Sequence, residues 1–262
     1  MRASPPVIGL AACALAPDAR RAVARNLRRV RGPAGPVRHA ADVARTFATY
    51  ASCLAEVFAA GSPHGRAAEA IVHGELHVED AMAGGRGVVF VTAHTAGWEA
   101  VGPLLLRDHG RAVMIAEQQE ADARAGGIQD GARRAQGLLV AHVGDDPLAA
   151  LPLARHLREG GVVALQIDRT PPGMRARDVV LFGAPGRVPE GPLRLASVTG
   201  AAVIPVFAAR RGHRRYDVVA YPAVHLPRAA RDDELDAAAQ HVANAMEDFV
   251  RRRPTQWFCF RA

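Results

Sequence analysis

A run of consecutive apolar residues, Val88 to Val91, constrains the fold more than any other stretch of the chain. It starts after Gly87 and ends in Thr92-Ala93-His94, and an uninterrupted apolar run of this length predicts a strand that is buried on both faces. The segment from Trp98 to Arg107 has the length and composition of a helix leaving that strand, with Gly102-Pro103 favouring a kink. This stretch therefore predicts one unit of an α/β sheet.

Strand and helix patterns alternate along the rest of the chain. Apolar runs predict strands at 112–116, 138–143, 162–167, 179–182, 202–207 and 216–220, with a short strand or turn near Ile71-Val72 and a turn over 183–186. Helices are expected at 17–30, 40–60, 78–82, 145–158, 190–199 and 232–252, and 117–134 is helical or partly loop. The predicted fold class is α/β: one domain, residues 1–262, with a largely parallel central sheet flanked by helices and with residues 1–60 packed on it as an N-terminal helical segment.

The most informative polar residues follow the first of these strands. His94 lies at the carboxyl end of the strand and Glu99 in the first turn of the helix, at the edge where open α/β sheets bind ligands. Five residues along one helix place two side chains about 140° apart, so the pair can meet only if His94 lies in the turn before the helix. Glu99 would then hold the imidazole in one tautomer, which makes His94 a general base.

Charge and composition bear on the partners of the chain. The 33 residues counted as Lys or Arg are all arginine, and the formal net charge is +7. This charge favours anionic partners such as lipid headgroups or phosphopantetheine carriers. Aromatic residues are few and do not alternate with the arginines, which disfavours nucleic acid. The cysteines, Cys13, Cys53 and Cys259, lack metal-ligand spacing and indicate reduced thiols in a cytosolic setting. No metal site is expected, because Gly74 disfavours a helix that would bring His73 and His77 together.

Several motifs resemble those of one enzyme family. H-x4-E after a buried strand, within VTAHTAGWE, is similar to the catalytic motif of the lysophospholipid acyltransferase superfamily. LREGGVVALQIDR and the closing PTQWFCF resemble the lipid A biosynthesis (lauroyl/myristoyl) acyltransferase branch. The resemblance implies transfer of a fatty acyl group from acyl-CoA or an acyl carrier protein to a hydroxyl of a lipid or glycolipid, with His94 and Glu99 catalytic and with no cofactor.

Further residues are expected to bind substrate. Asp168 and Arg169 end a predicted parallel strand at the same sheet edge as His94. Arg169 or Arg210 would suit a phosphate group, since the guanidinium plane matches phosphate oxygens, and Trp98 lies beside the catalytic pair. Three departures from the family pattern concern the acceptor: Gly97 stands where Asn is common, Arg169 where Gln is frequent and Thr255 where Glu is frequent.

Other readings remain open at this point. An acyltransferase or thioesterase of specialised metabolism, acting on a carrier-bound polyketide-like or glycosylated acceptor, fits the same dyad, and a non-catalytic acyl-binding protein fits the same fold. A serine nucleophile is disfavoured because no G-x-S-x-G elbow is present. The apolar N-terminal segment, 3–17, is shorter than the 20 or so residues that span a bilayer. The expected location is cytoplasmic, with peripheral contact to an anionic membrane surface.

Overall fold

The structure is a computed structural model that describes residues 4–60, 68–118, 123–144, 147–171 and 173–260. A seven-stranded sheet forms its centre, in the order β1-β9-β8-β2-β5-β3-β4. Every neighbouring pair in this sheet is parallel except β8 with β9. The predicted α/β class with a largely parallel sheet is therefore confirmed. The strands are β1 (Glu69–His73), β2 (Val88–Thr92), β3 (Val113–Glu117), β4 (Leu139–His142), β5 (Val162–Gln166), β8 (Ala202–Gly212) and β9 (Arg215–Ala220).

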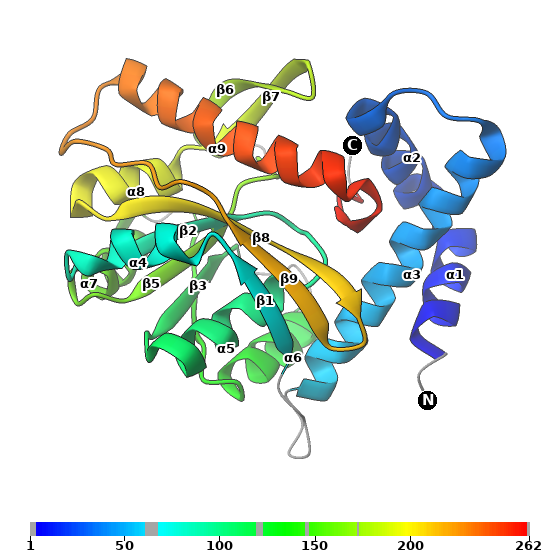
Figure 1. Ribbon diagram of the computed structural model, residues 1–262, viewed down its shortest axis with the longest axis horizontal. Coiled ribbons are helices and arrows are strands. Elements are labelled where there is room, and N and C mark those ends of the chain that lie inside the picture. The colour runs from blue at the N-terminus through cyan, green and yellow to red at the C-terminus, as the bar shows by residue number, and fades with distance from the viewer. Residues whose placement is uncertain (1–3, 61–67, 119–122, 145–146, 172, 261–262) are drawn as a thin grey trace.

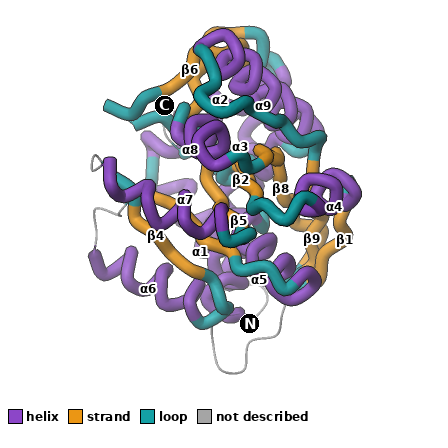
Figure 2. Tube along the Cα trace, turned by 90° about the vertical axis from the view of Figure 1, so that its left-hand side faces the viewer, coloured by secondary structure: helices purple, strands orange, loops and turns teal. Residues whose placement is uncertain are grey.

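Helices cover both faces of the sheet, as Figures 1 and 2 show. Because successive side chains of a strand point to opposite faces, β2 contributes to two separate cores. Val89 and Val91 pack with one helical layer, whereas Val88 and Phe90 pack with the other. The first layer is α7 (Leu151–Arg158), α8 (Gly191–Thr199) and α9 (Asp232–Arg252), and the second includes α4 (Glu75–Ala83) and α5 (Trp98–His109). The remaining helical elements after the N-terminal segment are α6 (Ala123–Arg134), η1 (Pro147–Ala150) and η2 (Pro254–Gln256).

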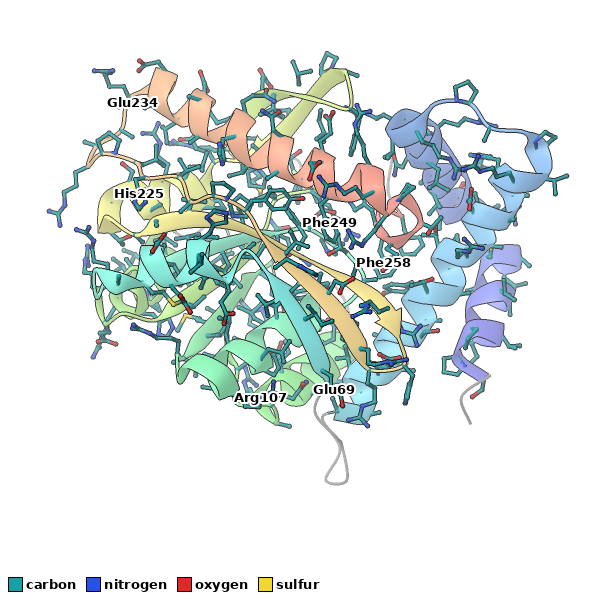
Figure 3. All side chains as sticks on the ribbon, viewed as in Figure 1. Glu69, Arg107, His225, Glu234, Phe249 and Phe258 are labelled. Atoms are coloured by element: carbon teal, nitrogen blue, oxygen red, sulfur yellow. The ribbon has the colours of Figure 1, made fainter. Side chains whose placement is uncertain are left out.

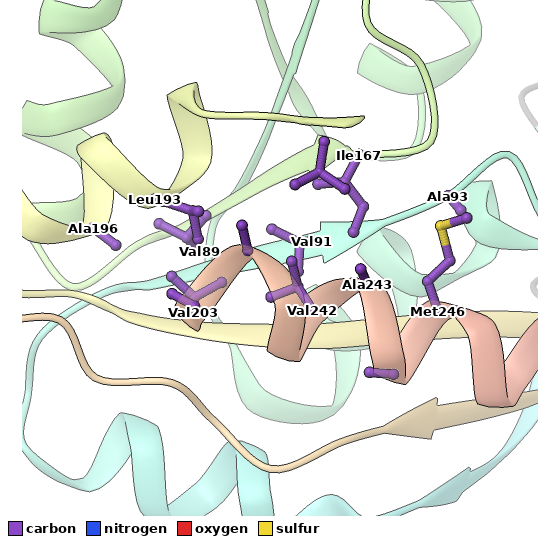
Figure 4. Close-up of a cluster of buried hydrophobic side chains, with 14 of the residues drawn as sticks. Val89, Val91, Ala93, Ile167, Leu193, Ala196, Val203, Val242, Ala243 and Met246 are labelled. Carbon is purple, nitrogen blue, oxygen red and sulfur yellow. The ribbon is translucent and has the colours of Figure 1, made fainter. Parts of the chain in front are cut away.

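The larger core lies between the sheet and α9. Val242, Ala243 and Met246 of α9 face Val89, Val91 and Val203 of the sheet, as Figure 4 shows. All six side chains are at most 1% exposed. Burial of such apolar side chains contributes roughly 1.5–3 kcal/mol each for the larger ones, so this layer fixes the position of the central strands. It therefore also fixes the end of β2, where His94 follows.

Three helices form the N-terminal segment: α1 (Ser4–Leu15), α2 (Pro17–Arg31) and α3 (Pro36–Ala60). Helix α1 lies close against α3, since a Cβ atom on Gly9 would come within 2.4 Å of the Phe47 carbonyl oxygen. The apolar stripe of α2 is buried at Val23 and Leu27. Within the described ranges, no helix combines the length and apolar character needed to cross a bilayer.

The structure corrects two local expectations. The turn expected over 183–186 occupies only Phe182 and Gly183, and β7 (Ala184–Pro189) then pairs with β6 (Ala176–Leu181) as a separate hairpin. Both turn residues have positive φ angles, which suits a two-residue hairpin loop. Strand β8 runs to Gly212, five residues beyond its expected end. The expected helix start at Asp145-Asp146 lies outside the described residues.

Candidate active site

The turn that carries His94 connects β2 to α5. Gly97 is the residue before the helix and has a φ of 94°, a left-handed conformation that favours glycine. The chain near the C-terminus runs beside this turn: the Phe258 N–H donates to the His94 carbonyl oxygen at 2.7 Å, and the Ala96 N–H donates to the Gln256 carbonyl oxygen at 2.9 Å. Figure 3 shows Phe258 between the sheet and the N-terminal helices. The turn is therefore held by main-chain bonds to a distant segment.

His94 is paired with Asp168, which follows β5. The Asp168 carboxylate lies 2.8 Å from the Nδ1 atom of His94 and accepts the His94 main-chain N–H at 3.2 Å. The indole N–H of Trp257 donates to the second carboxylate oxygen at 2.9 Å. The Asp168 side chain is fully buried. Burial opposes its ionisation, but the charge and hydrogen bond of His94, assisted by Arg169 and Trp257, lower its pKa to about 2.

Glu99 has a different partner. It lies in the first turn of α5, and its carboxylate accepts two hydrogen bonds from Arg133 of α6, at 2.9 and 3.1 Å. Arg133 is only 2% exposed, also pairs with Glu117 of β3, and stacks on the Trp98 ring at 5.3 Å. Burial raises the pKa of Glu99, while Arg133 opposes this shift. The expected contact in which Glu99 orients His94 is thus replaced among the described residues by a bond from His94 to Asp168.

The predicted substrate-binding residues occupy different places. Trp98 and Arg169 line the cavity beside His94, and the Arg169 guanidinium donates to the Phe258 carbonyl oxygen at 3.0 Å. Asp168 lies behind His94 and is shielded from solvent. Arg210 belongs to the extended part of β8, and its guanidinium is paired with Glu56 of α3 at 2.7 Å.

A cavity of about 870 Å³ opens in front of His94. Its apolar wall comes from α3, α5 and the segment near the C-terminus, and includes Leu54, Val57, Leu104, Leu106, Phe258 and Phe260. Its polar wall contains four amide side chains, Gln118, Gln129, Gln136 and Gln166, with Glu117 and Arg169. One cavity thus offers an alkyl-compatible surface and a hydrogen-bonding surface, and the imidazole of His94 lies in its lining.

Sequence reasoning did not identify the roles of Arg133 and Trp257. The role of Asp168 as the partner of His94 was also missed, although its position at the sheet edge was expected. The signal that would have found it is strand order: β2 and β5 are neighbours, so His94 and Asp168 leave the sheet side by side. No comparable signal marks Arg133, because it lies on α6, which is separated from β2 along the chain by α5 and β3.

An α/β sheet that holds a half-buried imidazole against a buried carboxylate, beside a cavity with apolar and polar lining, defines a site suited to acid–base chemistry on an amphiphile. The chain belongs to the family of bacterial lipid A biosynthesis acyltransferases, whose sequence model matches residues 6–262.

Two curated relatives are named as phosphatidylinositol mannoside acyltransferases. A phosphatidylinositol mannoside acyltransferase of Mycobacterium tuberculosis is 29% identical over 196 residues, which cover 73% of this chain and 59% of the relative. One of the same name from Mycolicibacterium smegmatis is 28% identical over 240 residues, covering 89% of this chain and 75% of the relative. The match thus spans about three-fifths of the length of the Mycobacterium tuberculosis protein.

Proposed function

We propose that this protein transfers a fatty acyl group from a thioester to a hydroxyl of a lipid or glycolipid, with His94 as the general base. The observation that carries the proposal is the 2.8 Å bond between His94 and the buried carboxylate of Asp168, in the lining of the cavity. Because Nδ1 is engaged by Asp168, Nε2 is the ring nitrogen left for a ligand. The names of the relatives support a glycolipid as acceptor.

The reaction follows from this arrangement. Nε2 of His94 takes the proton of the acceptor hydroxyl as its oxygen attacks the thioester carbonyl carbon. The carbon–sulfur bond of the resulting tetrahedral species then breaks, and the imidazolium returns the proton to the departing thiolate. Asp168 stabilises the imidazolium between these two steps and keeps the neutral ring in the tautomer that has its proton on Nδ1. No covalent acyl-enzyme is required.

The cavity divides the substrates by polarity. The alkyl chain would lie along the apolar wall formed by α3 and α5, and the polyhydroxylated part of the acceptor would face the four glutamines. Amide side chains both donate and accept hydrogen bonds, which suits sugar hydroxyls. Among the described residues, the Gln166 amide nitrogen and Arg169 Nε are buried without a hydrogen-bond partner, so a ligand oxygen there would satisfy them.

The second carboxylate belongs to the same site. Glu99 would hold Arg133 under Trp98 and add negative potential near His94, which favours the imidazolium. The thioester donor would be acyl-CoA or acyl carrier protein, used as a co-substrate rather than a resident cofactor. Arg169 is the residue proposed to meet a phosphate of the donor or acceptor.

Peripheral contact with an anionic membrane is the proposed setting. Helix α1 exposes Val7, Ile8 and Leu15, and α2 beside it carries six arginines. Apolar side chains adjacent to cationic ones favour binding to the surface of an anionic bilayer. Co-sedimentation with vesicles containing anionic lipid, but not with neutral vesicles, would support this contact. Equal recovery with both kinds of vesicle, or with neither, would contradict it.

The central experiment is an acyl-transfer assay with radiolabelled acyl-CoA and acyl carrier protein, using a glycolipid extract as acceptor. His94→Ala should lower the rate by about 10²–10⁴-fold, which is the usual contribution of a general base. His241→Ala is the matched control, since His241 lies on α9 and its ring bonds the Pro222 carbonyl oxygen at 3.2 Å. Transfer that survives in His94→Ala would overturn the mechanism.

The same assay distinguishes the alternatives. Labelled free fatty acid released without acceptor identifies a thioesterase. Transfer only to a carrier-bound metabolite identifies an acyltransferase of specialised metabolism. Binding of acyl ligands without turnover, unchanged in His94→Ala, identifies a non-catalytic acyl-binding protein.

A further inference from the structure

Gly97 of the catalytic turn lies directly under the ring of Tyr216 from β9. A Cβ atom built on Gly97 would lie 2.1 Å from Cδ1 and 2.4 Å from Cε1 of this ring. Real Cβ contacts are never this close, so the Tyr216 ring occupies the space that a side chain at position 97 would need. Both residues line the cavity that contains His94.

The hydroxyl of Tyr216 donates to the carboxylate of Glu56 on α3. The Glu56 side chain is 7% exposed and also accepts hydrogen bonds from Arg210 Nη2 at 2.7 Å, Arg210 Nε at 3.0 Å and the Arg214 main-chain N–H at 3.1 Å. Burial alone would raise the pKa of Glu56, but Arg210 and Tyr216 outweigh it and lower this pKa. The carboxylate is therefore an ionised, buried centre that joins α3 to the β8–β9 hairpin.

A second connection leads from Glu56 to the same turn. The main-chain N–H and carbonyl of Arg210 bond the side-chain amide of Gln256, at 2.7 and 3.1 Å. The main-chain carbonyl oxygen of Gln256 in turn accepts a hydrogen bond from the Ala96 N–H at 2.9 Å. Glu56 is thus connected to the residues beside His94 by two chains of contacts. One runs through the Tyr216 ring and the other through Arg210 and Gln256.

We propose that Tyr216 and Glu56 are positioning residues that set the geometry of the 94–97 turn, and that the ring of Tyr216 is a second reason for glycine at position 97, beside its left-handed backbone. The inference rests on the proposed function for its catalytic consequence, although the packing is independent of it. Tyr216 is not itself a proton donor to substrate, because its hydroxyl is bound to Glu56. Since α3 also supplies the apolar wall of the cavity, the same carboxylate links the alkyl-binding wall to the catalytic turn.

The first test removes one hydroxyl. Tyr216→Phe keeps the ring over Gly97 and leaves Glu56 with fewer donors, so the turn loosens. We expect kcat to fall about tenfold with KM changed less than about twofold, because misplacement of a catalytic group affects the transition state more than substrate binding. Tyr221→Phe is the matched control: its hydroxyl also donates to a carboxylate, Asp248 at 2.7 Å, but on α9 away from the cavity. Equal kcat values for the two variants would overturn the positioning role.

The second test examines the contact itself. Gly97→Asn introduces the non-glycine residue that best tolerates a left-handed backbone, so the remaining effect is the collision with Tyr216. We expect a lowered Tm that is partly recovered in Gly97→Asn/Tyr216→Ser. Gly85→Asn is the control for backbone strain, since Gly85 has a φ of 72° with nothing within 4 Å of its added Cβ. Additive effects of the two substitutions on Tm would contradict the packing.

The two tests also separate this inference from the proposed function. The Tm values of the single and double variants report on the Gly97–Tyr216 contact whether or not a substrate has been found. If the wild-type protein transfers no acyl group to any acceptor but the two substitutions have non-additive effects on Tm, the proposed function is refuted and the contact is retained. If the wild type is active but the effects on Tm are additive, the inference alone is refuted.

Discussion

Two carboxylates, those of Asp168 and Glu99, flank the turn that carries His94, and their surroundings differ. The Asp168 carboxylate is hydrogen-bonded to the His94 imidazole, which carries a charge only when protonated, and to the neutral Trp257 indole. The Glu99 carboxylate is instead bound by Arg133, which is always charged. When His94 takes up a proton, Asp168 gains a direct ionic partner, but the charge of Glu99 is already compensated. Proximity in sequence therefore does not decide which carboxylate assists a histidine. The decisive property is whether the carboxylate still lacks a cation.

The largest expected effect concerns Glu99, the carboxylate whose charge is compensated by Arg133. Arg133→Met should lower the free energy of unfolding by about 3–5 kcal/mol, because it leaves Glu99 and Glu117 close together without their shared cation. Urea denaturation measures this loss. Adding Glu99→Gln to Arg133→Met should recover part of it, whereas Arg134→Met, on the exposed neighbour in α6, should have little effect. No recovery in the double variant would mean that Arg133 acts mainly through its packing on Trp98.

The next largest effect separates the two carboxylates in catalysis. Asp168→Asn should lower kcat by about 10²-fold or more, because asparagine carries no charge to stabilise the imidazolium. Glu99→Gln should lower kcat by no more than about tenfold, since its contribution is electrostatic and partly cancelled by Arg133. Steady-state rates of acyl transfer test the ranking. A larger loss in Glu99→Gln would reverse the roles assigned to the two residues.

The two carboxylates should also give opposite dependences of stability on pH. Asp168 has a lowered pKa of about 2, so between about pH 2 and 4 the unfolded chain binds more protons and its contribution of about 2–3 kcal/mol is lost as pH falls. The pKa of Glu99 is raised in the folded protein. At pH values above the ordinary pKa of glutamate, the folded protein therefore binds more protons than the unfolded chain, and stability falls as pH rises. Urea midpoints of wild type, Asp168→Asn and Glu99→Gln, measured from about pH 2 to about pH 7, give both signs. A gap between wild type and Asp168→Asn that stays constant below pH 4 would contradict the assignment.

The smallest effect sharpens the description of Asp168. Trp257→Phe keeps an aromatic ring against Phe182 and removes the indole donor to the carboxylate. A hydrogen bond to a charged group contributes about 1.5–3 kcal/mol, of which only a part is specific to the transition state, so kcat should fall about threefold to tenfold. An unchanged kcat would show that Trp257 contributes packing alone.

Much of the fold could be predicted from local patterns. The strand Val88–Thr92 and the helix Asp232–Arg252 were expected at nearly their observed positions, because continuous apolar runs and 3.6-residue periodicity are strong signals. Strand β7 was missed because Pro185 and Gly186 both disfavour strands. A two-stranded hairpin tolerates both residues, because each strand has one outer edge at which a main-chain N–H is not needed for strand pairing.

The site was predictable in part, and the limit has a physical cause. A histidine after a buried strand marks the reactive edge, and both Asp168 and Arg169 were expected at that edge. The choice between Glu99 and Asp168 depends on which strands are neighbours, and strand order in a parallel sheet is set by crossover connections rather than by local sequence. Arg210 illustrates the same limit, because its pairing with Glu56 joins elements that lie 154 residues apart.

The long sequence separations around His94 also bear on how the protein acquires activity. Asp168 is 74 residues from His94, Trp257 is 89 residues from Asp168, and Tyr216 is 160 residues from Glu56. Helices form from neighbouring residues within microseconds, whereas contacts between distant segments require slow closure of large loops. After dilution from denaturant, helical ellipticity should therefore recover before acyl-transfer activity. The interval between the two signals would measure the lifetime of a compact but catalytically silent intermediate.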